Sequence, residues 1–350
     1  RCRDFRLEAK ELYDDEIDGT VKSLMYDVWY SRHGQPAYTP TLAHIAAGFG
    51  VGPGASVGCE ETDFLTKVFH SQLACTHRDL YTFYVQAIAG STWADAEKRR
   101  MAQYGLSVVL GGRLCTVPKN VDTERTINTE PPLNMMFQKG IGSILEDGLL
   151  SVFGIDLSYQ PDINRRMALE GSVLLNKGTV DLRGASDSNA TRLCQEICPP
   201  TMFGWLALAR SPFTILPDGT TVELHMVSTM GNAFTFPLQT AIFASIVVAC
   251  YRQLGLKTPR CNSKEPSYGV FGDDIIVCRE AYDLVCRTLV RYGFSVNDDK
   301  SFNSGLFRES CGGDYWCGNL VRGVYIRKLD TEADVHSAIN RLVRWSARSQ

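Results

Sequence analysis

The sequence predicts a mixed α+β fold, and three observations point to it. Apolar residues recur at helical spacing along much of the chain, short apolar stretches typical of strands lie between the predicted helices, and two such stretches flank a tight turn in residues 268–278. Of the 350 residues, 44% are hydrophobic and 21% are charged, which excludes a disordered, collagenous or fibrous chain. A chain of this length can bury a large core in one elaborated domain or in two.

The first 112 residues are predicted to be mainly helical. Apolar residues recur at helical spacing between Leu12 and Val28, and residues 62–105, from Leu65 to Leu73 in particular, show a second helical pattern. A short strand at 107–110 is expected to end at the glycine pair that follows it.

A glycine-rich run, Gly48 to Gly58, separates these two helical patterns. A phosphate-binding loop of this kind closes with Gly-Lys-Ser or Gly-Lys-Thr, but here Cys59 and Glu60 follow Gly58. A turn-rich connection is therefore the better interpretation.

From residue 113 onward, predicted helices and strands alternate, after an irregular and partly extended stretch up to residue 131. The interleaving, with one hairpin, is the pattern of an α+β architecture. The predicted helices span 134–153, 162–171, 187–198 with Asp187 or Ser188 as its cap, 234–254 and 280–292, and the predicted strands lie at 179–182 and on both sides of the turn in 268–278.

The formal net charge is −3 and the isoelectric point is near 6.1. This balance argues against a surface that is cationic throughout, although it leaves room for a basic channel inside an acidic body. The 12 cysteines form no Cys-x-x-Cys pair and have no histidine at zinc-ligand spacing, so buried free thiols in a reducing compartment are expected. No signal peptide is recognisable after Arg1, and the most apolar stretch, 241–250, is short for a membrane span, so we expect a soluble protein.

The first candidate site is the pair Asp273 and Asp274, placed after Gly272 at the tip of the predicted hairpin. Two adjacent carboxylates repel one another, and a divalent cation such as Mg²⁺ relieves that repulsion. A solvated turn is the alternative interpretation of this pair.

A second acidic segment favours the metal-site interpretation of Asp273 and Asp274. Asp181 stands at the end of a predicted strand, 92 residues before Asp273, and Asp187 follows it by six residues near a predicted helix start. Carboxylates from two strands can share a pair of metal ions that clamps the attacking and leaving oxygens in phosphoryl transfer.

Between the two acidic sites lies a small polar loop, Ser228-Thr-Met-Gly-Asn232, at the entrance to a long predicted helix. Its amide and hydroxyl groups could approach a sugar, or it could be an ordinary helix entry.

In this order the segments 181–187, 228–232 and 271–274 resemble motifs A, B and C of viral RNA-dependent RNA polymerases. The chain is most similar to the replicases of levivirus-type single-stranded RNA bacteriophages. The resemblance runs from about residue 113 to residue 328, with further matching stretches at 134–142, 156–157, 170–172, 307–312 and 325–327.

The resemblance implies a right-hand polymerase fold, with a palm of antiparallel strands flanked by helices and a truncated thumb. The implied divisions are an N-terminal and fingers region at 1–112, fingers with the basic motif F at 113–178, the palm with motifs A to D at 179–309, including a finger insertion near 199–222, and the motif E hairpin with the start of the thumb at 310–350.

The resemblance also assigns roles around the acidic residues. It implies that Asp181, Asp273 and Asp274 hold two Mg²⁺ ions. It further implies that Asp187 and Asn232 sense the ribose 2′-hydroxyl, the group that separates ribonucleotides from deoxyribonucleotides. Ser228 and Gly231 would shape the loop beside the templating base pair.

Basic residues complete the implied site. Lys119 and Arg125 resemble the finger residues that grip the triphosphate, although a solvated charged loop would look the same. Lys300 stands where such polymerases keep a lysine that protonates the departing pyrophosphate, and Arg308 could serve electrostatically instead. The segment 311–317 resembles the hairpin that supports the nascent strand, or is a simple packed hairpin.

Three departures from the family pattern stand out. Phe271 replaces the usual tyrosine before Gly-Asp-Asp, Arg183 brings a cation close to Asp181, and Asp122 and Glu124 put negative charge into the finger loop.

The implied activity is template-directed RNA synthesis from ribonucleoside triphosphates, in the cytoplasm of an infected bacterium and away from membranes. The implied partners are the RNA template and product, the host elongation factors Tu and Ts, and a small-subunit ribosomal protein. A reverse transcriptase would carry a bulky residue at Asp187 and lack Asn232, an inactive RNA-binding relative would have lost a metal carboxylate, and a two-metal nuclease would leave the loop 228–232 unexplained.

Overall fold

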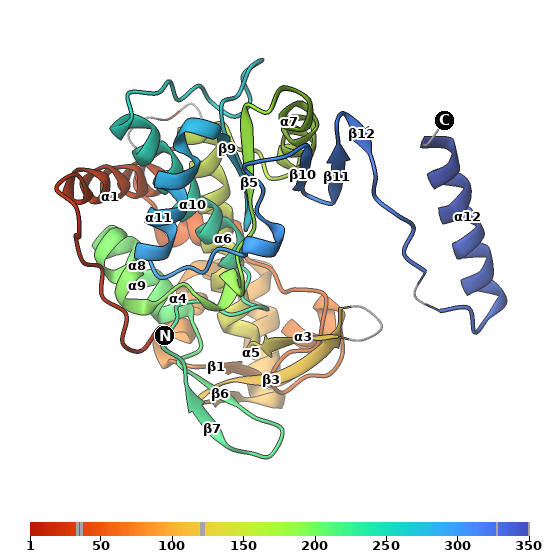
Figure 1. Cartoon of the computed structure of the whole chain (residues 1–350). Helices are drawn as coiled ribbons and strands as arrows, with labels where there is room; N and C mark the ends of the chain where they lie inside the picture. Colours follow the sequence, from red (N-terminus) through yellow and green to blue (C-terminus); the bar gives the residue numbers. More distant parts are fainter. Residues whose placement is uncertain (33–34, 36–37, 120–122, 327, 349–350) are drawn as a thin grey trace.

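The computed structural model describes residues 1–32, 35, 38–119, 123–326 and 328–348. Helices and strands interleave along the chain, which confirms the predicted mixed α+β class (Figure 1). The helices are α1 (Asp14–Tyr30), α2 (Leu42–Ala47), α3 (Phe64–Phe69), α4 (Arg78–Ile88), α5 (Thr92–Tyr104), α6 (Pro132–Phe153), α7 (Gln160–Leu174), α8 (Thr191–Ile197), α9 (Pro200–Ala209), α10 (Thr235–Gln253), α11 (Tyr282–Arg291) and α12 (Glu332–Arg348).

The strands of the described residues form four small sheets. The sheet that carries the acidic residues is antiparallel, in the order β5-β9-β8. A second sheet, in the order β4-β3-β6-β7, pairs β3 with β6 and so joins residues 111–113 to residues 213–215. The strands are β1 (Leu73–Cys75), β2 (Leu106–Val108), β3 (Gly111–Pro118), β4 (Glu124–Thr129), β5 (Lys177–Val180), β6 (Phe213–Ile215), β7 (Thr221–Glu223), β8 (Gly269–Phe271), β9 (Asp274–Cys278), β10 (Phe307–Ser310), β11 (Gly313–Trp316) and β12 (Asn319–Leu320).

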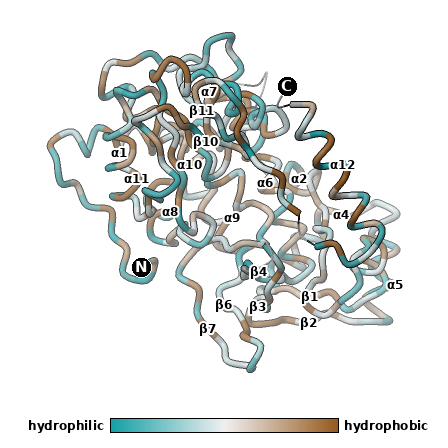
Figure 2. Tube along the Cα trace, turned by 45° about the vertical axis from the view of Figure 1, so that its right-hand side comes forward, coloured by the Kyte–Doolittle hydropathy of each residue, from teal (hydrophilic) through white to brown (hydrophobic). Residues whose placement is uncertain are grey.

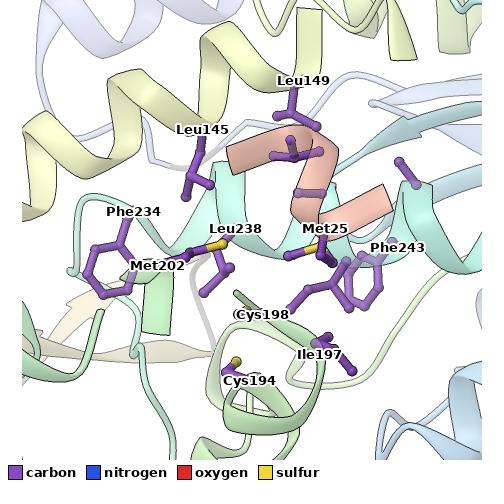
Figure 3. Close-up of a cluster of buried hydrophobic side chains, with 14 of the residues drawn as sticks. Met25, Leu145, Leu149, Cys194, Ile197, Cys198, Met202, Phe234, Leu238 and Phe243 are labelled. Carbon is purple, nitrogen blue, oxygen red and sulfur yellow. The ribbon is translucent and has the colours of Figure 1, made fainter. Parts of the chain in front are cut away.

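Helix α10 forms the centre of the core because it is apolar on all sides. Helices α1 and α6 pack against it, and α8 and α9 close the same cluster (Figure 3). The cluster brings together Met25, Leu145, Leu238, Phe243 and Met202, from four different helices. The α10 segment also has the length and apolarity of a membrane span, but 89% of it is buried inside the protein, as in the core helix of a soluble domain.

The acidic start of the chain is fixed to the basic face of α11. The buried Asp14 accepts hydrogen bonds from Arg287 and from the backbone amides of Lys10 and Glu11, and Asp18 pairs with Arg291. Burial opposes ionisation of Asp14, but these hydrogen bonds outweigh it and lower the pKa of the carboxyl. Part of the acidity of the N-terminal segment is therefore neutralised within the fold.

The glycine-rich run is an irregular connection without helix or strand, as predicted. The buried Lys67 ammonium donates hydrogen bonds to the carbonyl oxygens of Gly52 and Gly54, at 2.7 Å for Gly52. The loop therefore binds its cation through carbonyl groups, which is the opposite polarity to a phosphate cradle.

All twelve cysteines are free thiols, as the sequence predicted. Six of them are buried, five are partly buried, and Cys317 is exposed. Burial raises the pKa of the Cys261 thiol to about 12, so this group stays protonated at neutral pH.

Several details of the sequence prediction were wrong in the N-terminal half. Leu12 precedes α1 and is fully exposed, while Leu73 belongs to strand β1 and not to a helix. The glycine pair does not end the extended stretch: Gly111 begins β3, and a methyl group there would lie 1.8 Å from the Phe213 carbonyl oxygen of the neighbouring β6. The stretch after residue 112, expected to be irregular and partly extended, is extended over most of its described length and pairs as the hairpin β3–β4.

One predicted helix cap was also wrong. Helix α8 begins at Thr191, after Ala190, and neither Asp187 nor Ser188 caps it. The Asp187 carboxylate instead accepts a hydrogen bond from a distant backbone amide, that of Met230.

Helix α12 stands apart from the rest of the chain (Figure 1). Apolar and polar residues alternate along its trace in Figure 2, and its large apolar side chains are exposed, whereas Ala338 is buried. The exposed apolar residues of α12 are Val335, Ile339, Leu342, Val343 and Trp345.

Candidate functional site

The register of the β5-β9-β8 sheet brings the acidic motifs together. Val180 at the end of β5 pairs with Ile275 of β9 in antiparallel fashion. One step beyond this pair, the chain after β5 reaches Asp181 and β9 begins at Asp274. The antiparallel register therefore sets Asp181 and Asp274 opposite one another on neighbouring segments. The predicted hairpin is present as β8–β9, and its last pair is Phe271 with Asp274.

Gly272 makes the hairpin turn possible. Its φ is +58°, in the left-handed region, and a methyl group at this position would lie 2.4 Å from the Phe236 ring of α10. The Gly272 amide donates to the Thr240 hydroxyl at 3.0 Å, and Phe271 packs edge-on against Phe236 with ring centroids 4.6 Å apart. The ring of Phe271 therefore supports the turn without a hydroxyl group.

The carboxylates of this turn share one electrostatic environment. Burial, together with the negative charges of Asp274 and Asp181, raises the pKa of Asp273, and the Arg125 charge partly offsets the rise. Burial and the charge of Asp181 likewise raise the pKa of Asp274, against the hydrogen bonds that its Oδ1 accepts from the Cys311 amide at 2.9 Å and the Ser310 hydroxyl at 3.3 Å. The site thus concentrates negative charge that a cation would neutralise.

Asp181 is held by a polar loop that precedes β10. The Asn297 side-chain amide donates to Asp181 Oδ2 at 2.6 Å, and the Asn297 backbone amide donates to the Asp181 carbonyl oxygen at 2.9 Å. The Ser301 hydroxyl accepts from the Asp181 amide at 3.1 Å. The same asparagine accepts from Arg183 Nε at 3.0 Å, and Arg183 also pairs with Asp299 at 2.9 Å. The guanidinium of Arg183, which departs from the family pattern, is therefore hydrogen-bonded to the loop that holds Asp181.

The two basic candidates near β10 differ sharply in exposure. Lys300 ends the 3₁₀ turn Asp298–Lys300 in the loop that holds Asp181, and its side chain is exposed. Arg308 is completely buried and donates to the carbonyl oxygens of Lys177, Ser304 and Gly305. Arg308 is thus hydrogen-bonded within the fold, whereas Lys300 is exposed to solvent.

The loop 228–232 meets Asp187 directly. The Met230 amide donates to Asp187 Oδ1 at 3.3 Å, and burial raises the pKa of Asp187. The buried Ser228 hydroxyl accepts a hydrogen bond from the side chain of Asn189 at 3.1 Å. Because Asn189 lies two residues after Asp187, this bond ties the start of the loop 228–232 to the Asp187 segment. Asn232 Oδ1 accepts from the Phe234 amide at 3.0 Å at the entrance to α10.

Gly231 lies against strand β4. Its φ is +115°, and a methyl group there would lie 2.3 Å from the Asn128 carbonyl oxygen. The Asn128 amide donates to the Met230 carbonyl oxygen at 2.8 Å. The loop and β4 therefore touch through their backbones, which only glycine permits at this position.

The basic candidates Lys119 and Arg125 belong to the β3–β4 hairpin. Arg125 pairs with Val117 in the strand register, and Lys119 follows the last pair at the hairpin end, where its amide donates to the Thr123 carbonyl oxygen. Both side chains are exposed, and the Arg125 charge reaches Asp273. Glu124 is exposed at the start of β4, whereas Asp122 lies outside the described residues.

Within the described ranges, no group of three or more His, Cys, Asp and Glu side chains converges closely enough to hold a metal ion in these rotamers. The donor set nevertheless suits a divalent cation, because it consists of carboxylate oxygens, and burial together with their mutual repulsion raises the pKa of Asp273 and Asp274. Coordination by Asp181, Asp273 and Asp274 together would require rotation of their side chains.

Comparison with known proteins identifies the family. The family model described as RNA replicase, beta-chain, matches residues 45–349. The chain belongs to the RNA replicase beta-chain family. It is 42% identical over 274 residues to the RNA-directed RNA polymerase subunit beta of Escherichia virus Qbeta, a match that covers 78% of this chain and 44% of the relative.

Two further relatives share the description RNA-directed RNA polymerase beta chain. The RNA-directed RNA polymerase beta chain of Escherichia phage MS2 is 38% identical over 280 residues, which is 80% of this chain and 49% of that one. The beta chain of Enterobacteria phage fr is 36% identical, over 83% of this chain and 52% of that one. The chain thus spans about half the length of the curated relatives it matches. A solved RNA-dependent RNA polymerase of a human picorbirnavirus aligns with 68% of this chain and 54% of its own at 13% identity, with a TM-score of 0.41, which is too slight to carry an argument.

Sequence reasoning missed three groups of this site. Asn297 holds Asp181, the Cys311 amide holds Asp274, and Asn128 lies beneath Gly231. Asn297 could have been noticed as the start of the polar run that ends at Lys300, but neither of the other two contacts leaves a signal in the sequence, because each depends on tertiary packing.

Proposed function

We propose that this replicase chain carries the centre for template-directed RNA synthesis, in which ribonucleoside triphosphates extend an RNA 3′ end. One observation carries the proposal: the strand register sets Asp181 next to Asp274, beside a glycine turn that presents Asp273. Family membership and the contact of the polar loop 228–232 with Asp187 support it.

In this proposal Asp181, Asp273 and Asp274 hold two Mg²⁺ ions. When bound, such a pair supplies a lowered pKa for the 3′-hydroxyl and charge neutralisation on the triphosphate. The role of the chain is to place its carboxylates. The Asn297 amide donates to Asp181, and the Cys311 amide and Ser310 hydroxyl donate to Asp274, so each carboxylate is already hydrogen-bonded and would rotate to complete a metal site.

Selection of ribose is proposed for Asp187 and Asn232. Asn232 Oδ1 is occupied by the Phe234 amide, which leaves the Nδ2 group as the donor to a 2′-hydroxyl. Asp187 Oδ1 accepts from Met230, so its second oxygen can accept from the same hydroxyl. A donor and an acceptor that meet one hydroxyl reject an analogue without it, since both would lose a partner. Ser228 and Gly231 fix the path of the loop between these residues.

The basic residues are proposed to handle phosphate. Lys119 and Arg125 project from the β3–β4 hairpin as exposed cations and would bind the triphosphate, with Arg125 electrostatically linked to Asp273. Lys300, exposed in the loop that holds Asp181, would give a proton to the departing pyrophosphate.

The proposed organisation is that of a right hand. The N-terminal and fingers region would occupy 1–112, the fingers with the basic hairpin 113–178, the palm 179–309, and the motif E hairpin and start of the thumb 310–350. The pairing of β6 with β3 supports a finger insertion within the palm segment, near 199–222. The proposed setting is the cytoplasm of an infected bacterium, with RNA, the elongation factors Tu and Ts and a small-subunit ribosomal protein as partners.

The test is incorporation of labelled ribonucleotides on a defined RNA template, with and without Mg²⁺. We expect incorporation that depends on Mg²⁺ and follows the template. Preferred use of deoxyribonucleotides would favour a reverse transcriptase, and shortening of the labelled RNA without synthesis would favour a nuclease; either result would overturn the proposal.

A further inference from the structure

A buried carboxylate in the fingers has no role in the chemistry described above. Glu130 follows β4 and is only 1% exposed. Burial raises the pKa of this carboxyl, against the hydrogen bonds that it accepts and the charge of Arg210. A buried acid of this kind requires partners, and it has three.

The three partners are all donors. Asn128 Nδ2 donates to Glu130 Oε1 at 2.7 Å, while the Ser211 hydroxyl and Gln138 Nε2 donate to Oε2 at 2.6 and 3.1 Å. They come from β4, α6 and the segment between α9 and β6. Because a carboxylate only accepts hydrogen bonds, it satisfies three converging donors, whereas an amide would set its own NH₂ group against one of them.

Two of these partners, Asn128 and Gln138, also contact the backbone in or next to the loop 228–232. The backbone of Asn128 grips the middle of the loop, with its amide bonded to the Met230 carbonyl oxygen and its own carbonyl oxygen beneath Gly231. The Met230 amide in turn bonds Asp187.

The second route reaches the far end of the loop. Gln138 Oε1 accepts from the Ala233 amide at 3.4 Å, directly after Asn232. The orientation of the Gln138 amide is set by its Nε2 group, which donates to Glu130 and to the Ala209 carbonyl oxygen. Glu130 thus orients the side chains of two residues that hold the loop on either side of Asn232.

We propose that Glu130 is a positioning residue that fixes the loop 228–232, through Asn128 and Gln138, in the form that distinguishes ribonucleotides from deoxyribonucleotides. This inference rests on the proposed function of the site. Glu130 itself does not touch the nucleotide, so its loss changes discrimination by displacing Asn232 and Asp187.

The test compares Glu130→Gln with Glu97→Gln. Glu97 is a matched control, since it is a buried carboxylate, 3% exposed, that binds Arg100 in α5. For each protein, dissociation constants for ATP and for 2′-deoxy-ATP are measured with template RNA and Mg²⁺, and the thermal midpoint is recorded beside them.

We expect Glu130→Gln to lower the preference for ATP over 2′-deoxy-ATP by about tenfold, the effect of roughly one lost hydrogen bond of 1.4 kcal/mol. Glu97→Gln is expected to lower the thermal midpoint and to keep the preference. If Glu130→Gln does not fold, Ser211→Ala removes one of the three donors and is expected to lower the preference by a smaller factor.

The outcomes separate the two proposals. A wild-type chain that binds both nucleotides equally would overturn the proposed function. A wild-type preference that survives Glu130→Gln, or Ser211→Ala where the first variant does not fold, would overturn the role of Glu130 alone. Equal weakening of both nucleotides in the variant would show a merely structural carboxylate and would also overturn it.

Discussion

Replacement of Asp273 by asparagine should make the metal-free protein more stable while it abolishes catalysis. Asp273 is partly buried and repelled by Asp274 and Asp181, and its pKa is raised. A carboxyl with a raised pKa destabilises the folded state once it ionises, and that destabilisation is relieved as the pH falls through the folded-state pKa. Asparagine keeps the shape of the side chain and removes the charge.

The magnitude follows from the charges around the turn. Two unit charges roughly 7 Å apart interact by about 2 kcal/mol at an effective dielectric constant of about 20. Two carboxylates repel Asp273 and one guanidinium, that of Arg125, attracts it, so the net gain on neutralisation is about 2 kcal/mol. For a chain of this size that corresponds to a rise in the thermal midpoint of about 2–4 °C.

The assay is thermal unfolding of the wild type and of Asp273→Asn, in chelator and in Mg²⁺, at pH 7 and at pH 4. In chelator at pH 7 the variant should unfold at the higher temperature, and the difference should shrink at pH 4. Magnesium should stabilise the wild type, by about 2.7 kcal/mol at a hundredfold excess over the dissociation constant, and leave the variant unchanged. A variant that is less stable than the wild type in chelator, or that keeps the magnesium shift, would refute the reasoning.

Three further predictions concern the loop, the Asp181 support and the N-terminal anchor. Gly231→Ala should strain the backbone by about 1–2 kcal/mol and displace the loop from Asn128, lowering ribonucleotide incorporation at least tenfold; Gly219→Ala, at φ +85° in open space, is the control and should retain activity in the same incorporation assay. Asn297→Ala removes a charge-assisted hydrogen bond worth about 1.5–3 kcal/mol, so the Mg²⁺ concentration for half-maximal incorporation should rise about tenfold or more, and an unchanged value would reject the positioning of Asp181. Asp14→Ala should cost about 3–5 kcal/mol in urea unfolding because Arg287 loses its buried partner, whereas the exposed Asp15→Ala should cost little.

The pH dependence of that anchor has a definite sign. The pKa of Asp14 is lowered in the folded state, so its contribution to stability is present above the unfolded pKa of about 3.9 and is lost as the pH falls below it. Urea midpoints of the wild type and of Asp14→Ala should therefore converge in acid; a constant gap between pH 7 and pH 2 would contradict the assignment.

The parts of the site that could be predicted are those that local sequence determines. A glycine before two aspartates between apolar stretches specifies a tight hairpin, and the structure has Gly272 at φ +58° in that turn. Asp181 could be placed at a strand end because a short apolar stretch surrounds it and a turn follows. The resemblance to the replicases then supplied the link between the two strands, which the register of β5 and β9 agrees with.

The parts that could not be predicted depend on partners distant in sequence. Asp187 had the pattern of a helix cap, but its carboxylate bonds Met230 instead. Arg308 looked like a spare cation, yet the carbonyl oxygens around it hold it inside the fold. Leu73 fits a helical period, but its pairing with Leu106 makes it a strand residue. In each case a tertiary contact overrode a local preference.

The most direct test of the central claim is a magnesium titration of templated ribonucleotide incorporation by the wild type and by Asp181→Asn, Asp273→Asn and Asp274→Asn, with the exposed Asp218→Asn as control. If the three carboxylates form one cation site, each of their variants loses incorporation at every Mg²⁺ concentration while Asp218→Asn follows the wild type. Incorporation at the wild-type level by any of the three would contradict the account.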